Sequence, residues 1–256
     1  MVDGHLQLTV SEQLQRGHYE SLSAEYETHY SDPCTQRYRV RFMYEPMLDG
    51  INLRGRRVLD AMCGSGQATE FLLSRGADVI GLDISPQAID SFKSNWPECR
   101  SICRSALDTG LESESIDCVT VVGGLHHAHP HVEEVVHEFH RVLKPGGYVC
   151  FVEPHSGSLP DVVRRLWYKI DPVFSANEES IDLASLKSAF TSYFDFRREI
   201  YLGNVAYLGV LNSMVFRLPL RWKALYSPGL MWLEAVLNRF QGKRTACCIV
   251  GQWQKR

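Results

Sequence analysis

The sequence predicts an α/β fold in which helices cover both faces of a mostly parallel sheet. Three observations carry this prediction: a strand–turn–helix–strand unit near residue 60, short apolar runs that alternate with amphipathic stretches, and a length of 256 residues with 45% apolar content. Strand-length apolar runs separated by helical patterns are typical of βαβ units. A chain of this length suits one such domain.

The strongest local pattern is a strand, a turn, a helix and a second strand. A buried parallel strand is expected at 57–61, and Gly64 and Gly66 follow it in a turn where the backbone approaches a ligand. A helix expected over 67–75 leads to a second strand that ends on Asp83. An acid at this place suits the two hydroxyls of a ribose, so the unit indicates a nucleoside-containing cofactor.

Two residues argue against a nicotinamide dinucleotide as this cofactor. Thr69 stands where the dinucleotide fingerprint has its third Gly or Ala. Asp60, just before the turn, has the wrong charge to lie beside a pyrophosphate and the right charge to hold a cationic amino group. A nicotinamide-dependent enzyme is therefore the less favoured alternative.

The remaining elements continue the alternation, after a loose lead-in expected over residues 1–15. Further helices are expected at about 18–30, 36–48, 85–95, 131–143, 159–170 and 182–190. Further strands are expected at 99–103, 115–122, 148–152, 193–201 and 245–253, the last of them at the sheet edge. The Lys-Pro-Gly-Gly segment at 144–147 is expected to end the helix before it.

Two of these motifs resemble those of the class I S-adenosylmethionine-dependent methyltransferases. The family's first motif, Asp/Glu-x-Gly-x-Gly-x-Gly, corresponds to residues 60–66 (DAMCGSG), where Met62 replaces the first glycine. The segment 141–147 (RVLKPGG), followed by a strand, is the second signature. The resemblance covers roughly residues 40–155. It implies a Rossmann-like seven-stranded sheet with an antiparallel last strand, and a helical hydrophobic insert precedes that strand.

The resemblance implies that S-adenosyl-L-methionine is the cofactor. Ser105 stands where relatives usually place an Asp that accepts from the adenine amino group, so adenine recognition is expected to depend on backbone groups. The residues expected to bind the cofactor are Asp60, Met62, Cys63, Gly64, Gly66, Asp83, Ile84, Ser105, Ala106, Gly123 and Leu125. Because of Met62 and Ser105, a non-catalytic relative that binds S-adenosylmethionine is an alternative.

Methyl transfer from a sulfonium needs a general base only where the acceptor must lose a proton. Candidate proton acceptors are His126, His127, His129, His155 and Tyr19. The first two lie on the loop after the fourth strand, where ligands of open α/β sheets gather. We expect His127, His126 and Tyr19 to be catalytic, and a purely positioning role for the histidines is the alternative.

Six histidines between 126 and 140 raise the question of a metal site. His137 and His140 are spaced to share a helix face. No Cys or Asp stands nearby at ligand spacing, so no metal is expected.

The chain is expected to form a single methyltransferase domain over 1–256. Its parts are an N-terminal helical lid at 1–50, a cofactor-binding core at 51–155 and a substrate-side half at 156–256. The last part contains an insert at 202–243 that is rich in Leu, Trp and Phe. This insert has three candidate roles: a cap over a hydrophobic acceptor, a peripheral membrane contact, or a homodimer interface. Short helices are expected within it, broken by prolines and glycine.

Charge is distributed unevenly along the chain. Residues 196–256 contain ten Lys or Arg and two Glu, a net charge of +8 in a chain whose net charge is −3. A solvated basic face is one explanation, and contact with a phosphorylated substrate or a membrane surface is another. No RNA-binding signature accompanies these residues, so no nucleic-acid partner is expected.

The eight cysteines contain no CxxC pair, and the first residues lack a secretory signal pattern. We therefore expect a cytoplasmic protein with reduced thiols. Its expected function is in-line methyl transfer to a small-molecule or lipid-like hydrophobic acceptor. Whether oxygen, nitrogen or carbon receives the methyl group stays open.

Overall fold

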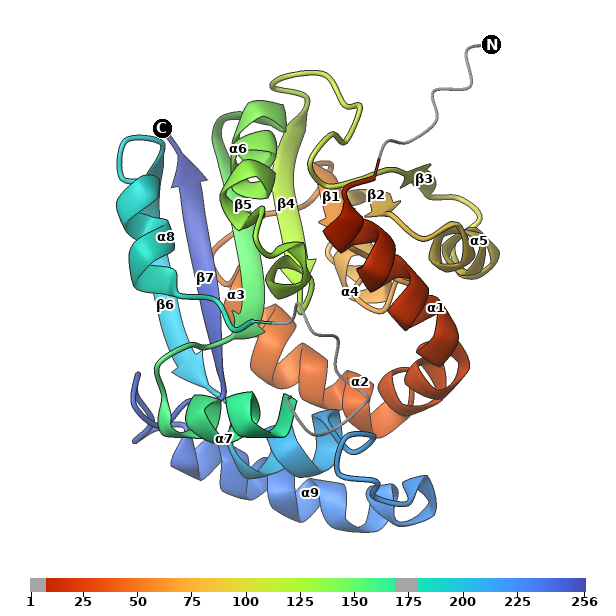
Figure 1. The fold of residues 1–256 in the computed structure, drawn as a ribbon, viewed down its shortest axis with the longest axis vertical. Coiled ribbons are helices and arrows are strands. Elements are labelled where there is room, and N and C mark those ends of the chain that lie inside the picture. The colour runs from red at the N-terminus through yellow and green to blue at the C-terminus, as the bar shows by residue number, and fades with distance from the viewer. Residues whose placement is uncertain (1–7, 169–178) are drawn as a thin grey trace.

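A seven-stranded sheet forms the centre of the molecule, and helices cover both of its faces (Figure 1). The computed structural model describes residues 8–168 and 179–256. The strands are β1 (Arg57–Ala61), β2 (Asp78–Asp83), β3 (Arg100–Cys103), β4 (Ile116–Val122), β5 (Leu143–Pro154), β6 (Phe194–Leu202) and β7 (Cys248–Lys255). Their order is β3-β2-β1-β4-β5-β7-β6, and only the pairs made by β7 are antiparallel. The predicted fold class is confirmed.

Strand β7 lies inside the sheet, between β5 and β6, and not at the edge where the sequence analysis placed it. Ile249, Val250 and Trp253 are completely buried, whereas β6 carries the exposed Arg197. A strand that is apolar on both faces needs cover on both faces, and a charged strand suits an edge. The sequence analysis placed the strand at 245–253 at the edge and was wrong, because the apolar β7 needs cover on both faces and the charged β6 does not.

Most helices follow the expected pattern within a few residues. They are α1 (Val10–Tyr30), α2 (Pro33–Arg39), α3 (Glu45–Leu48), α4 (Thr69–Ser74), α5 (Pro86–Asn95), α6 (Val132–Val142), α7 (Leu159–Tyr168), α8 (Leu183–Ala189) and α9 (Leu220–Leu237), with short π or 3₁₀ turns η1 (Val40–Tyr44), η2 (Leu125–Ala128) and η3 (Tyr207–Leu211). Helix α1 begins at Val10, so the loose lead-in expected up to residue 15 is wrong from that point, and residues 1–7 lie outside the described chain.

The two faces of the sheet bury two separate clusters because successive strand residues point to opposite sides. Val58 contributes to the cluster covered by α2, α3 and α4. Its neighbour Leu59 contributes to the cluster covered by α6 and α8. Each central strand therefore supplies apolar residues to both layers, as expected of a doubly covered sheet.

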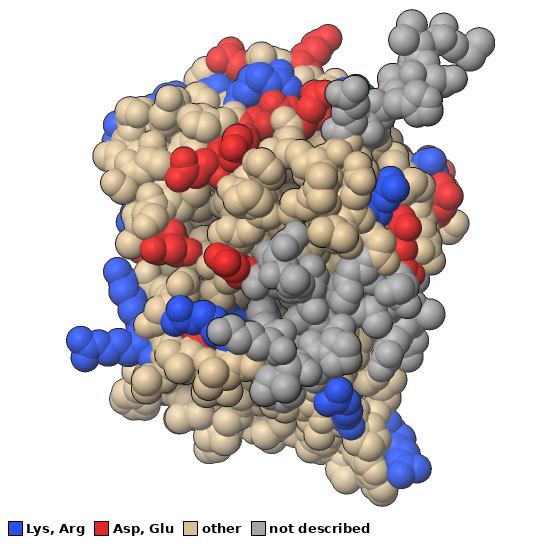
Figure 2. All heavy atoms as spheres, viewed as in Figure 1, with Lys and Arg blue, Asp and Glu red and all other residues tan. Residues whose placement is uncertain are grey.

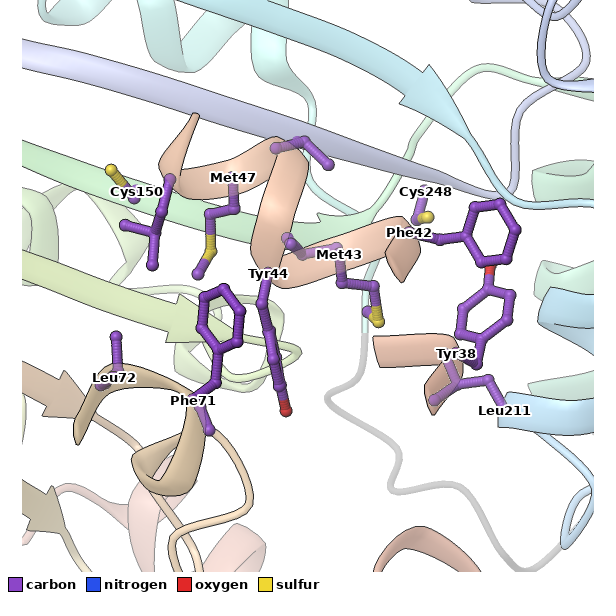
Figure 3. Packing of buried hydrophobic residues seen from close by; sticks show 14 of the residues in the cluster. Tyr38, Phe42, Met43, Tyr44, Met47, Phe71, Leu72, Cys150, Leu211 and Cys248 are labelled. Atoms are coloured by element: carbon purple, nitrogen blue, oxygen red, sulfur yellow. The ribbon is translucent and has the colours of Figure 1, made fainter. Parts of the chain in front are cut away.

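The helix expected over 36–48 is a continuous run of α2, η1 and α3. Its aromatic side chains point into the first cluster, where Tyr44 faces Phe71 of α4 at 5.5 Å between ring centres and Tyr38 lies beside Phe42 (Figure 3). This run joins the N-terminal part to α4 and to strands β5 and β7.

Helix α6 ends at Val142, where the sequence predicted a terminator. The following residues 143–147 already belong to β5, and the pairing with β4 is interrupted between Ile116 and Cys118. Gly146, with a φ of 77°, supplies the backbone conformation that this irregularity needs.

The insert contains one long helix in place of the short, broken helices that the sequence analysis expected. Helix α9 continues through Pro228 and Gly229. The hydroxyl of Ser227, next to the proline, donates a hydrogen bond to the Lys223 carbonyl one turn earlier. Within the described residues, no helix has the length and apolar character needed to cross a membrane.

The insert is held to α2 by a buried carboxylate. Glu234 is completely buried and accepts hydrogen bonds from the Tyr38 hydroxyl at 2.9 Å and from the backbone N–H groups of Asn204 and Ala206 at 3.1 and 2.8 Å. Burial raises the pKa of Glu234, and these donors oppose that effect.

We expect Glu234→Ala to lower the free energy of unfolding by about 2–4 kcal/mol, since it leaves several buried donors without an acceptor. Arg239→Ala, at an exposed position just beyond the end of α9, should change it by less than about 0.5 kcal/mol. Urea unfolding followed by circular dichroism measures both. Equal, small effects of the two substitutions would contradict the anchoring role.

Candidate functional site

The turn after β1 holds three residues in a left-handed backbone conformation. The φ angles are 57° at Met62, 56° at Gly64 and 89° at Gly66. Glycine adopts this conformation freely, whereas an L-residue such as Met62 loses about 1 kcal/mol. Met62 packs against the loop after β4, because a Cβ on Gly124 would stand 2.7 Å from the Met62 Cβ. The turn and that loop are therefore in direct contact.

Gly66 is required for packing as well as for its φ angle. A Cβ there would come within 2.4 Å of the Trp96 indole nitrogen, which donates to the Ser65 carbonyl at 3.3 Å. Cys63 is buried beside this turn, and its N–H donates to the Leu82 carbonyl at the end of β2.

Asp83 connects the ends of β1 and β2. One carboxylate oxygen accepts from the Gly64 N–H and the other from the Ser85 N–H, both at 2.9 Å. Burial raises the pKa of Asp83, and these backbone donors oppose the shift. The acid at the tip of the second strand thus lies directly on the glycine-rich turn, with Ile84 next to it in the chain.

Asp60 lies beneath the turn and is almost completely buried. Thr69 and Thr120 donate to its two oxygens at 3.1 and 3.4 Å. Burial raises the pKa of Asp60 to about 7, which these hydroxyl donors oppose. A buried carboxyl with so few partners can accept a cationic amino group of a ligand.

Arg39 is a buried cation that the sequence analysis missed. Its guanidinium donates to the Tyr44 hydroxyl at 3.3 Å, lies over the Tyr30 ring and acts electrostatically on Asp60. Asp60 and Arg39 together provide both charges needed to hold an amino-acid zwitterion. Arg39 stands in a helix with alternating arginines that resembles a solvated surface, so no sequence signal separated it from its neighbours.

A second carboxyl missed by the sequence analysis fixes the loop after β4. Glu153, at the end of β5, accepts from the N–H groups of Gly124, Leu125 and His126 at 3.0, 2.8 and 3.2 Å. Its other contact is the His126 Nδ1 at 2.7 Å. An acid directly after the apolar run 148–152 was the signal that could have revealed it.

Burial determines the charge of this pair. It raises the pKa of Glu153 to about 8, opposed by the three N–H donors, and lowers the pKa of His126 to about 3. His126 is therefore a neutral imidazole at physiological pH. Its place beneath the loop makes it a support for the neighbouring His127, whose ring lies 3.8 Å away between centroids.

The structure brings two of the predicted catalytic residues into contact. The Tyr19 hydroxyl, from α1, lies 2.9 Å from the His127 Nε2, on the loop after β4. The two rings meet edge to face with 4.8 Å between centroids. These residues are 108 positions apart in the chain.

Helix α1 reaches the strand ends through its carboxylates as well. Glu12 contacts the Ser105 hydroxyl, and Glu20 accepts from the Ser85 hydroxyl at 2.8 Å. Ser105 and the buried Ala106 follow β3. The predicted adenine-binding residues are thus present at the expected edge, with α1 lying over them (Figure 1).

The other histidines make contacts that do not involve Tyr19 or His127. The His155 Nε2 lies 3.0 Å from the Lys243 carbonyl, and His137 and His140 pack against Tyr193. His129 is held through its carbonyl, which accepts from Ser11. Among the described side chains, no three His, Cys, Asp or Glu residues are grouped to hold a metal ion.

These residues meet at the switch point between β1 and β4, where the strand order reverses. Gly123, with a φ of 66°, closes β4, and a Cβ there would meet nothing within 4 Å. The glycine-rich turn, Asp83, Asp60 and the loop after β4 all lie at or next to the carboxyl ends of the neighbouring strands β1, β2 and β4. They define an open α/β protein that binds a nucleoside attached to an amino acid.

Comparison with known proteins leads to the family. Residues 59–151 match the model of a methyltransferase domain. This match covers the part of the chain that contains the glycine-rich turn, Asp83 and the loop after β4, and it agrees with the resemblance to the class I S-adenosylmethionine-dependent methyltransferases. The resemblance found in the sequence is confirmed.

Similar proteins include an uncharacterized methyltransferase of Synechocystis, 39% identical over 119 residues that make up 46% of this chain and 56% of that protein. The ubiquinone biosynthesis O-methyltransferase of Pseudomonas fluorescens is 36% identical over 40% of this chain and 45% of its own length. The match thus spans about half the length of these relatives. A solved magnesium protoporphyrin IX methyltransferase from Synechocystis has the same fold, with a TM-score of 0.64 at 15% identity over 96% of this chain and all of that one.

The pKa of Asp60 predicts that cofactor affinity depends on pH. Raising the pH from 6 to 7.5 ionises Asp60, so affinity for the cationic amino group should rise roughly five- to tenfold. Isothermal titration with S-adenosylmethionine measures this, with a correction for the ligand's own α-amino group, which begins to lose its proton in the upper part of this pH range. Asp60→Asn should bind more weakly and lose the pH dependence; a flat profile in the wild type contradicts the assignment.

Asp83→Ala should weaken S-adenosylmethionine binding by about 2 kcal/mol, because a charged hydrogen-bond acceptor for the ribose is lost. Asp90→Ala, at an exposed position on α5, is the matched control and should leave the affinity unchanged. Calorimetry on both variants decides the assignment. An Asp83→Ala protein with normal thermal stability and normal affinity would remove the ribose role.

Proposed function

We propose that this protein is a methyltransferase that transfers the methyl group of S-adenosylmethionine to a small hydrophobic acceptor by in-line displacement. The contact between Tyr19 and His127 at the cofactor edge of the sheet is the observation that carries this proposal. It adds a proton-accepting pair to a cofactor-binding domain, which a protein that only binds the cofactor does not need. The bound cofactor supplies an already activated methyl group.

The proposed role of the pair is to remove a proton from the acceptor. An acceptor hydroxyl would donate to the Tyr19 oxygen while the Tyr19 hydroxyl donates to the His127 Nε2. The proton lost by the acceptor is then balanced by one gained at His127. His126, neutral and held by Glu153, keeps the His127 ring in place.

The proposed acceptor is lipid-like or otherwise hydrophobic. The apolar insert at 202–243 forms much of the substrate-side half, and one of the similar proteins is named as a ubiquinone biosynthesis O-methyltransferase. In this proposal, residues 1–50 form the lid, 51–155 bind the cofactor and 156–256 face the acceptor, all within one domain that acts in the cytoplasm.

The test is a screen of hydrophobic phenols, quinols and amines with a radiolabelled methyl donor. Label transferred to an extractable acceptor supports the proposal. Cofactor binding without transfer to any acceptor, in the screen and in extracts of the producing cells, favours the alternative of a non-catalytic relative.

With an acceptor in hand, His127→Ala and Tyr19→Phe should each lower turnover about 100-fold or more, the range of a lost general base. Cofactor affinity should change little, and His126→Ala should have a weaker effect. His137→Ala, which alters a ring packed on Phe190 and Tyr193, is the control. Drops below about fivefold in both main variants would show that the pair only positions the acceptor.

A further inference from the structure

Helix α9 turns its largest apolar side chains to the solvent. Trp222, Leu225 and Trp232 are 53%, 76% and 67% exposed, and Phe240, just past the helix end, is 85% exposed. Spacings of three and seven residues place Trp222, Leu225 and Trp232 in an apolar stripe along one side of the helix. Most helices on a protein surface have the opposite arrangement.

The side of α9 that faces the protein carries Met231 and two buried charged residues, Lys223 and Glu234. The buried Lys223 Nζ contacts the Asp32 carboxylate at 2.5 Å, the Thr35 hydroxyl at 2.6 Å and the Ser213 hydroxyl at 2.9 Å. Glu234 holds the same side through the contacts described above. If α9 rotated to bury its tryptophans, Lys223 and Glu234 would lose their hydrogen-bond partners. These buried contacts therefore fix the orientation of α9.

The exposed charges that residues 202–245 contribute all have one sign. Five exposed residues of this segment are basic: Arg217, Arg221, Arg239, Lys243 and Arg244. The only acid between 202 and 245 is Glu234, which is buried. In Figure 2 the lower part of the molecule, where α9 lies in Figure 1, is tan and blue with little red.

We infer that the outer side of α9 docks on the surface of an anionic lipid membrane. Tryptophans suit the boundary between head groups and acyl chains, and arginines beside them bind lipid phosphates while their stems lie on apolar groups. A dimer through this stripe would bring the basic residues of two copies together without an acid to pair them. Charge complementarity thus selects the membrane over a second copy.

In this orientation, α9 lies between the membrane and the N-terminal helices that we propose as the lid. Lys223 also donates to the His29 carbonyl, at 3.2 Å, so α9 contacts the junction of α1 and α2 directly. Tyr19 lies on α1. This inference concerns binding alone, and its test is independent of the proposed methyl transfer.

Vesicle sedimentation of the full chain tests the inference. Phosphatidylcholine vesicles with about 30% phosphatidylserine should bind the protein, and pure phosphatidylcholine vesicles should bind it at least about tenfold more weakly. The variant W222Q/L225Q/W232Q should lose most of the binding. V10Q/L14Q, which removes equally exposed apolar residues near the start of α1 at the other end of the molecule (Figure 1), should retain it.

Charge reversal provides a second test that leaves the apolar stripe intact. R221E/R239E should lower binding about tenfold or more, whereas R54E/R100E, with the same change in net charge at other exposed sites, should lower it far less. Sedimentation velocity without lipid should give a monomer. The inference is overturned if the wild type ignores anionic vesicles, if target and control variants bind equally, or if W222Q/L225Q/W232Q dissociates a dimer.

Discussion

One buried carboxyl group holds together the loop on which the candidate chemistry depends. Glu153 sits at the end of β5, yet its hydrogen bonds go to three consecutive N–H groups and one imidazole of the loop after β4. These donors have no helix or sheet of their own to satisfy them. His127 is the next residue of this loop, and its Nε2 contacts the Tyr19 hydroxyl.

Helix α1 completes the site by a different kind of contact. Its described polar contacts with the strand ends and the loop after β4 include those of Ser11, Glu12, Tyr19 and Glu20, partly buried hydrogen bonds that each contribute about 1 kcal/mol. Helices α2 and α3, in contrast, are packed into the apolar cluster of Figure 3.

The insert shows how buried polar groups can override hydrophobic pattern. Leaving two tryptophans and a leucine in water is unfavourable by roughly 25 cal/mol per Å² of exposed apolar surface. Turning Lys223 and Glu234 out to solvent is also unfavourable, because partners such as the Tyr38 hydroxyl and the Ala206 N–H would stay buried without a hydrogen bond. The helix therefore keeps its polar side inward, and the apolar stripe becomes available for binding.

The sequence by itself determined the sheet, the glycine-rich turn, Asp60 and Asp83, because these depend on local spacing and on a chain order that short loops enforce. Strand β5, whose apolar run was recognisable, ends on an acid whose importance was not. Arg39, Glu153 and the pairing of Tyr19 with His127 were decided only by the tertiary structure. Each depends on groups that lie far apart in the chain and meet because the sheet fixes where its strands and loops end. The tertiary structure also decided the place of β7 and the direction of α9. The place of β7 depends on burial of both faces of the strand, and the direction of α9 depends on the partners of its buried charged residues.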